Sequence, residues 1–336
     1  MSFFRGGSSI FTTAKGTSSC STSKITRLCL VARVLEKLFV GFVDVLGVTS
    51  VDDELFVLLD RDSDQVAVFS VNDYRLLRHF SLPGLERNSE NDLTSCVRHR
   101  CLYASDHDNG RVHRYDLASS ATSKWPVPGF PHGLSVTPSC NLLVTCSEPN
   151  KLVELSADSG QCVREIALQS GNGWPCHAVQ LTTGQYVVTF RDRVCIVDND
   201  GRVVVLTRSY GGQCGSGVFQ LWVPRHLAVD EDSQFIFVAD FFNDRVVVLS
   251  PTLEFVRYIN ERLSRPRRLH FHHARARFLF VLDDSRSFTR QVMMLLPHCL
   301  ALLFLSLFCF ACYYLFSYLY GLLTHYTKEL GGRVLW

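Results

Sequence analysis

The sequence lacks the features that mark most enzyme families and nucleic-acid-binding proteins. Its 34 basic and 32 acidic residues leave a formal net charge of only +2, whereas a nucleic-acid binder carries a clustered basic surplus, so we expect no DNA binding. It has no H-E-x-x-H and no G-x-S-x-G, and the glycine-rich stretch at 211–217 lacks the lysine of a phosphate-binding loop. These absences favour a binding protein over an enzyme without deciding between them, and we expect no catalytic residue and no cofactor.

Signals for secretion are also missing. Residues 1–27 are rich in Ser, Thr and Gly and contain no apolar stretch of signal-peptide length, and the chain has no N-x-Ser/Thr acceptor. We expect 1–27 to be a disordered leader, with a mitochondrial transit peptide as the alternative. Six of the thirteen cysteines lie in or beside strand-like apolar runs, which is typical of reduced core thiols in a cytosolic protein. These cysteines are Cys96, Cys101, Cys140, Cys146, Cys176 and Cys195.

What the sequence does contain is a repeat. A strand, a polar turn and a second strand recur, and the first apolar residue after each turn returns at intervals of 40 to 52 residues, which is the spacing of propeller blades. These residues are Val66, Val112, Leu152, Val194, Val246 and Val292. The strands are rich in β-branched residues, as expected of sheets buried between neighbouring sheets. The repeat therefore predicts an all-β propeller rather than separate domains.

Several turns of the repeat carry an aspartate at the same place. Asp60, Asp106 and Asp240 each precede the aligned apolar residue by six positions. A carboxylate there can accept hydrogen bonds from backbone N–H groups of its own turn. Asn109 with Gly110, and Asn243 with Asp244, then supply residues that tolerate a positive φ. We interpret these as structural turn residues.

A second recurring piece lies upstream of the hairpins, in 131–136, 175–181, 224–230 and 266–271, and each copy begins with a proline. In a propeller this piece would be the innermost strand, which lines the central channel. The polar residues near these prolines are His132, His177, Arg225, His226 and Arg267.

These polar residues have two interpretations. As a functional feature they would form a ring of donors and cations at the channel mouth, suited to an anionic ligand or an acidic peptide. Alternatively, they hydrogen-bond the neighbouring blade. His270, His272 and His273 lie close by in sequence, but no carboxylate recurs among them, so we expect no metal site.

The fifth unit, 224–250, resembles the NHL repeat, in which a proline and a small apolar strand precede Val-Ala-Asp, Asn and Arg-Val. Six units are counted, four of them clear, over about three quarters of the chain. Cys146 and Phe190 depart from the pattern because they stand where the turn aspartate is expected. The resemblance implies a six-bladed β-propeller over 28–296, like the C-terminal domains of tripartite-motif proteins but without their RING and B-box domains.

The two ends of the predicted propeller leave questions open. The sixth unit runs into an apolar stretch instead of an outer strand, so the segment 28–45 either closes the ring as a strand or forms a helix. Residues 297–325 carry no charged side chain before Lys328 and predict a transmembrane helix, with 326–336 as a short tail. More Arg before this stretch than after it would keep the propeller in the cytosol. The alternative is that the stretch is an artefact of gene prediction, and then the protein is cytoplasmic.

The resemblance suggests a scaffold that binds a protein, or RNA, on its loop faces and channel mouth. Trp125, Trp174 and Trp222 lie near blade junctions, and those that are exposed would be natural binding hot spots. One alternative is a metal-dependent lactonase, hydrolase or lyase, because six-bladed propellers can host such a site. Another is the substrate-recognition part of a ubiquitin-ligase assembly.

Overall fold

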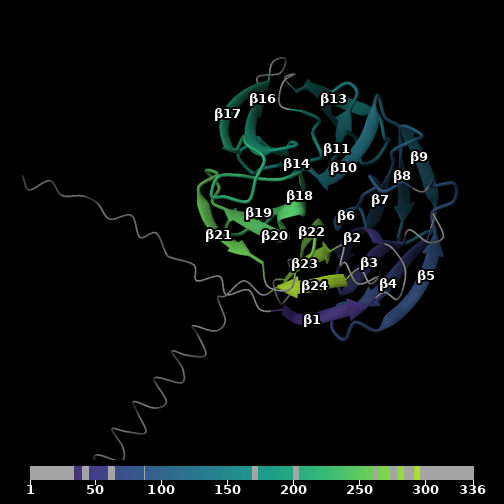
Figure 1. The fold of residues 1–336 in the computed structure, drawn as a ribbon. Coiled ribbons are helices and arrows are strands. Elements are labelled where there is room, and N and C mark those ends of the chain that lie inside the picture. The colour runs from purple at the N-terminus through teal and green to yellow at the C-terminus, as the bar shows by residue number, and fades with distance from the viewer. Residues whose placement is uncertain are drawn as a thin grey trace, which may run out of the picture.

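The structure is a computed structural model, and it describes residues 34–39, 45–59, 65–86, 88–168, 173–199, 204–260, 263–272, 278–283 and 291–295. Within these residues the chain forms strands β1 to β24 and one short 3-10 helix, η1 (Phe241–Asn243). The strands make six four-stranded antiparallel sheets, which Figure 1 shows arranged around a central axis. This arrangement is a β-propeller, so the predicted all-β propeller class is confirmed.

The first three sheets follow the chain in order. The first sheet contains β2 (Val45–Val51), β3 (Glu54–Leu59), β4 (Gln65–Ser70) and β5 (Leu76–Ser81). The second contains β6 (Leu93–Cys96), β7 (Cys101–Asp106), β8 (Arg111–Asp116) and β9 (Thr122–Pro126). The third contains β10 (Phe130–Val136), β11 (Leu142–Ser147), β12 (Lys151–Leu155) and β13 (Cys162–Ala167).

The next two sheets repeat this order, and the last differs. The fourth sheet contains β14 (His177–Gln180), β15 (Tyr186–Thr189), β16 (Arg193–Asn199) and β17 (Val204–Gly211). The fifth contains β18 (Pro224–Val229), β19 (Ile236–Asp240), β20 (Arg245–Leu249) and β21 (Phe255–Ile259). The sixth contains β22 (Pro266–His272), β23 (Phe278–Asp283), β24 (Gln291–Leu295) and β1 (Val34–Phe39).

The sixth sheet takes its outer strand from the other end of the chain. β1 pairs antiparallel with β24, with Phe39 opposite Gln291. Closer to the axis, the Ser50 hydroxyl in β2 lies 2.7 Å from Nε2 of His270 and 2.8 Å from Nδ1 of His272 in β22. The first and sixth sheets are therefore joined by hydrogen bonds between side chains as well as by apolar packing.

Apolar clusters lie between every pair of neighbouring sheets in the described part of the chain. The first strand of each sheet also lies against the first strands of the sheets on either side. A central strand such as β20 is consequently buried on both faces, and Val246 to Leu249 are 0% exposed. Burial on two faces explains why these strands are apolar without alternation, and burying each such side chain contributes roughly 1.5–3 kcal/mol.

The turn aspartates hold their turns through donors that differ from those expected. Asp106 accepts from the Asn109 side chain at 2.9 Å and from Nε2 of His113 at 3.0 Å. Asp240 accepts from the Asn243 side chain at 2.8 Å, and from Nε of Arg245 at the same distance. Side chains a few residues farther on, rather than the backbone of the turn, therefore bind these carboxylates. Asp60 lies outside the described residues.

The predicted leader (1–27), transmembrane helix (297–325) and tail (326–336) also lie outside the described residues. Within the described ranges, no helix has the length and hydropathy needed to span a membrane.

The close approach of the inner strands generates a prediction at Gly47 in β2. A Cβ added there would lie 2.5 Å from Cβ of Leu93 and 2.7 Å from its backbone N in β6. We expect Gly47→Ala to lower the free energy of unfolding by about 1–3 kcal/mol, because the added methyl overpacks a backbone contact. Urea unfolding would measure the loss. Gly217→Ala is the control, because its nearest neighbour is the end of the Gln220 side chain, and a loss of equal size there would contradict the close-packing argument.

Candidate polar cluster at the propeller axis

β-Bulges aim several predicted ring residues toward the axis. In β18 the register shifts between Pro224 and His226, and in β22 between Pro266 and Arg268, so Arg225 and Arg267 are the extra residues. A bulge tilts its extra side chain out of the regular pleat. Proline fits just before it because the first residue of a strand can spare its N–H group. The repeated proline of the sequence pattern therefore marks where polar side chains leave the sheets.

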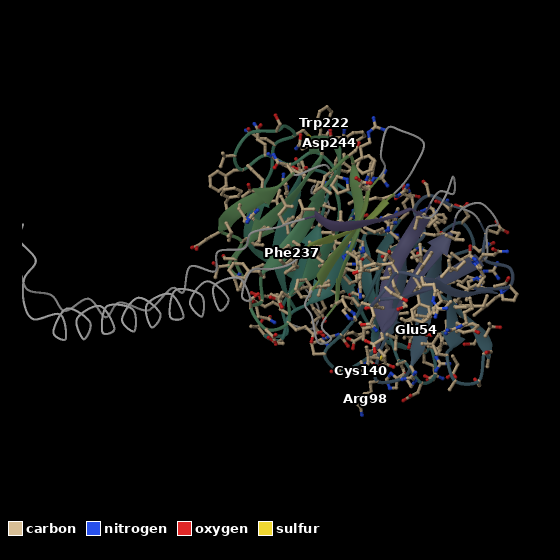
Figure 2. The ribbon with its side chains drawn as sticks, turned by 90° about the horizontal axis from the view of Figure 1, so that it is seen from below. Glu54, Arg98, Cys140, Trp222, Phe237 and Asp244 are labelled. Carbon is tan, nitrogen blue, oxygen red and sulfur yellow. The ribbon has the colours of Figure 1, made fainter. Side chains whose placement is uncertain are left out.

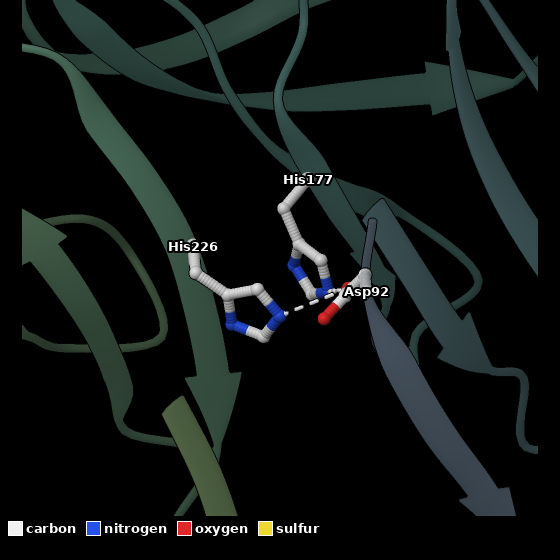
Figure 3. A group of neighbouring side chains, drawn as sticks. All are labelled: Asp92, His177 and His226. Atoms are coloured by element: carbon white, nitrogen blue, oxygen red, sulfur yellow. Dashed lines mark hydrogen bonds and ion pairs between the residues drawn. The ribbon is translucent and has the colours of Figure 1, made fainter. Parts of the chain in front are cut away.

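Asp92 is the centre of the cluster at this end of the axis. It lies just before β6, and its Oδ1 accepts from the N–H of Leu93 at 2.9 Å and lies 3.1 Å from Nε of Arg268. Its Oδ2 accepts from the N–H of Leu134 at 2.9 Å and from Nε2 of His226 at 3.3 Å. These partners belong to the second, third, fifth and sixth sheets. Only a side chain close to the axis reaches all of them, and Figure 3 shows Asp92 facing the histidines of β14 and β18.

The hydrogen bonds determine which nitrogen of each buried histidine carries the proton. Nε2 of His177 lies 3.1 Å from the carbonyl oxygen of Leu134, which can only accept, so Nε2 is the donor. Nδ1 of His226 accepts from the N–H of Leu269 at 3.3 Å, which leaves Nε2 of His226 to donate to Asp92. The imidazole of His226 is therefore neutral in this arrangement, and the Nε2 atoms of both histidines are already used.

Burial and Arg268 decide the charges of the cluster. Burial lowers the pKa of His177 well below its usual value, and the neighbouring His226 lowers it further. Burial also lowers the pKa of His226, although Asp92 opposes this. For Asp92 burial alone would raise the pKa, but Arg268 and the hydrogen bond from His226 outweigh it and hold the pKa well below the usual range. The cluster thus pairs one buried carboxylate with one buried guanidinium.

The loop from β5 to β6 brings a second carboxylate to the ring residues. Glu90 lies 2.9 Å from Nη1 of Arg225 and 3.7 Å from Nδ1 of His132. Arg267 donates to the carbonyl oxygen of Ser89 in the same loop. Burial raises the pKa of Glu90, but His132 and Arg225 reverse this and hold it far below the usual range. The chain itself therefore supplies the anion that the ring was expected to attract.

The residues at the axis include one group of metal-ligand type. Asp92, His177 and His226 bring one ligand atom each within 4.8 Å of one another. Their hydrogen bonds do not suit a metal, because both Nε2 atoms are protonated donors and each oxygen of Asp92 already has two partners. Nδ1 of His177 remains as a buried nitrogen without a partner. A single nitrogen falls short of the three protein ligands of a typical metal site, so these side chains do not fit a bound ion as they stand.

All five predicted ring residues belong to this cluster, whereas Glu90, Asp92 and Arg268 were not anticipated. A signal for them exists in the sequence. The units can be aligned on the first leucine of their inner strands, which is Leu93, Leu134, Leu227 or Leu269. The three residues before this leucine are Glu-Asn-Asp in the second unit. In the other three units they are a proline, a variable residue, and then Gly, His or Arg. Equivalent positions of different blades meet at the axis, so this alignment places the acidic residues of the second unit near the basic residues of the other units.

The cysteines of the described residues are free, and four of them are fully buried. Burial raises the pKa of Cys146 to about 12 and that of Cys195 to about 11. Thiols of this kind are unreactive because the thiolate is the reactive form, and they act as small apolar side chains of the core.

Next to the axial cluster lies a surface of exposed apolar side chains, which we call the aromatic platform. Its members and their exposed fractions are Trp174 (56%), Val218 (60%), Phe219 (59%), Trp222 (47%) and Phe242 (41%). The rings of Trp222 and Phe242 lie 5.4 Å apart. Figure 2 shows Trp222 and Asp244 at one end of the molecule and Cys140 and Arg98 at the opposite end. Trp125, by contrast, is 8% exposed and packs in the core.

Comparison with known proteins bears on the fold. No family model matches the sequence, and no curated protein matches it. A streptogramin B lyase structure has a TM-score of 0.55 at 12% identity, over 77% of this chain and 86% of that chain. The fold is shared. A catalytically inactive virginiamycin B lyase from Staphylococcus aureus with Quinupristin has a TM-score of 0.54 at 11% identity, over 77% and 87%.

The Cps50 (Swd1) β-propeller domain of Myceliophteria thermophila is also similar, with a TM-score of 0.53 at 12% identity over 75% of this chain and 82% of that chain. Lyases and a propeller domain of another kind therefore resemble this chain equally well. At such low identities the likeness shows the fold and leaves the activity open.

The axial cluster generates a stability prediction. We expect Asp92→Asn to lower the free energy of unfolding by about 3–5 kcal/mol, because Arg268, 4% exposed, would be left as a buried charge without its carboxylate. Urea unfolding would measure this, with Glu86→Gln as the control because Glu86 is exposed. A loss below about 1 kcal/mol for Asp92→Asn would contradict the role given to this ion pair.

The lowered pKa values predict the pH dependence of stability. Below about pH 6.5 the unfolded chain protonates His177 and His226 while the folded chain does not. The unfolded state therefore binds more protons, and the free energy of unfolding decreases as the pH is lowered. Below about pH 4 the unfolded chain also protonates Asp92 and Glu90 while these stay ionised in the fold, which adds to the loss. The double variant His177→Gln/His226→Gln should flatten the slope between pH 7 and 5, measured by urea unfolding. An unchanged slope would contradict this account, and His79→Gln, on the exposed face of β5, is the control.

Proposed function

We propose that this protein is a non-enzymatic binding scaffold that holds a protein partner on the end of the propeller where the inner strands begin. In this proposal the ring is a six-bladed propeller of NHL type, closed by β1 beside β24, and the aromatic platform is its main contact surface. The observation that carries the proposal is a loop that is held rigidly yet presents large apolar side chains to solvent.

That loop connects β17 to β18 over residues 212–223. Its backbone is fixed by the fifth sheet, since the N–H of Trp222 donates to Oδ1 of Asp240 at 2.7 Å. Nη1 of Arg245 donates to the carbonyl oxygen of Ser216 at 2.8 Å, and Nη2 to that of Gln220 at 2.9 Å. A loop held in this way loses little conformational entropy when it binds a partner. Aromatic side chains on a rigid loop are typical binding hot spots.

The axial cluster supports a binding role over a catalytic one. A general base needs a free lone pair within reach of a substrate. Asp92 is buried and saturated, Glu90 is paired with Arg225 and His132, and the unpartnered Nδ1 of His177 is buried away from solvent. These groups hold the sheets together, which gives the platform a stable base. Any ubiquitin-ligase activity in this proposal would come from a partner.

Variants of the platform test the proposal. We expect Trp222→Ala/Phe242→Ala to lower the retention of partner proteins from a cell extract by about tenfold or more, because hot-spot residues contribute about 2 kcal/mol or more each. Quantitative mass spectrometry of proteins retained by the full chain would measure this. Val97→Ala is the control, because Val97 is also an exposed apolar side chain, at 58%. It follows β6 in the second sheet, whereas the platform lies on the fourth and fifth sheets. Equal retention by all three proteins would contradict the platform as a binding surface.

A further inference from the structure

We infer that the aromatic platform binds an extended acidic peptide segment, in which Asp or Glu residues flank a large apolar side chain. This inference rests on the proposed function and goes further, because it names the chemistry of the partner. It follows from two arginines, Arg191 and Arg265, whose positions border the loops that carry the exposed rings.

Arg191 belongs to the part of the platform formed by the fourth sheet. It is exposed in the turn between β15 and β16, and its carbonyl oxygen accepts from the N–H of Val223, next to Trp222, at 3.0 Å. A Cβ placed on Gly173, the neighbour of Trp174, would lie 3.3 Å from Cβ of Arg191. Arg191 therefore lies between the loops that carry the two exposed tryptophans.

Arg265 borders the other side of the platform, before β22. Its guanidinium carbon lies 5.9 Å from the ring centre of Phe242, and its backbone N–H donates to Oδ1 of Asp244 at 2.8 Å. The two arginines and the rings between them therefore extend across the fourth, fifth and sixth sheets. Residues spread over three neighbouring sheets suit an extended segment rather than a compact ligand.

The charged groups at this surface differ in how they are paired. Within the described residues neither Arg191 nor Arg265 forms an ion pair, whereas the nearby carboxylates are engaged. Asp192 pairs with Arg193 at 3.0 Å, and Asp240 pairs with Arg245 at 2.8 Å. Arg191 is exposed and Arg265 is partly exposed. Two such guanidinium groups without carboxylates are complementary to two carboxylates of a partner, which they can bind in a bidentate way.

The same features argue for a peptide over RNA. Aromatic rings beside arginines can stack bases and hold phosphates, but a nucleic acid needs many cations to replace its counterions. This platform offers two unpaired ones, on a chain whose net charge is only +2. A peptide with two carboxylates and one apolar anchor residue matches both arginines and the exposed rings, so it fits this surface better than RNA does.

The inference can be tested with a displayed library of random twelve-residue peptides, selected on the full chain. We expect the recovered peptides to be enriched in Asp and Glu on both sides of Trp, Phe or Leu. In fluorescence polarisation the affinity of a labelled recovered peptide should fall at least tenfold in Arg191→Gln/Arg265→Gln. It should also weaken as salt is raised from 50 to 300 mM, because ion pairs at a surface are screened.

Two further variants, Arg98→Gln and Trp222→Ala/Phe242→Ala, separate the outcomes. Arg98→Gln is the matched control, because Arg98 is exposed at the opposite end of the molecule, and it should bind like the parent. If recovered peptides need Trp222 and Phe242 but lack acidic residues and ignore Arg191→Gln/Arg265→Gln, the inference is overturned while the proposed function stands. If peptides bind independently of Trp222 and Phe242, both are overturned. Tighter binding of a labelled poly-uridine 12-mer than of any peptide, lost in both double variants, would overturn the acidic-peptide inference in favour of RNA.

Discussion

The structure depends on one constraint, which is that each sheet is apolar on both faces and must be covered on both. Sheets of this kind have no stable existence alone, and a ring gives each of them two neighbours. The apolar clusters between all neighbouring sheets are the result. They allow the loops at the two ends of the ring to vary without loss of the fold, and the loop before β18 uses that freedom to display aromatic side chains.

The ring also brings equivalent residues of different sheets to one axis, where polar groups would be buried at a cost unless they were paired. Asp92 meets this requirement by binding two backbone N–H groups, His226 and Arg268. A buried ion pair of this kind is weak evidence for net stabilisation, but it penalises any arrangement that separates the partners. We therefore infer that the axial cluster determines how the sheets are placed relative to one another. The aromatic platform beside it is not needed for that purpose and is available for binding.

Several parts of this structure could be predicted from the sequence, and for local reasons. The hairpins carry strand-forming residues on both sides of polar turns, and the prolines that begin β18 and β22 mark inner strands. The predicted ring of His132, His177, Arg225, His226 and Arg267 assembles because its members occupy repeated positions. Glu90 and Asp92 escaped prediction because the second unit departs from the repeat at the very place where the other units carry proline and a basic residue.

The sequence by itself determined the class of fold, because hydrophobic pattern and turn chemistry act over a few residues. It also determined that the inner strands bear polar residues at one end. Only the tertiary structure decided what those residues do, since His226 meets a carboxylate 134 residues away and Arg225 pairs with Glu90 of the chain's own loop between β5 and β6. The aromatic platform is likewise a product of the ring, because the loops that carry Trp174 and Trp222 both contact Arg191 only when the fourth and fifth sheets stand side by side.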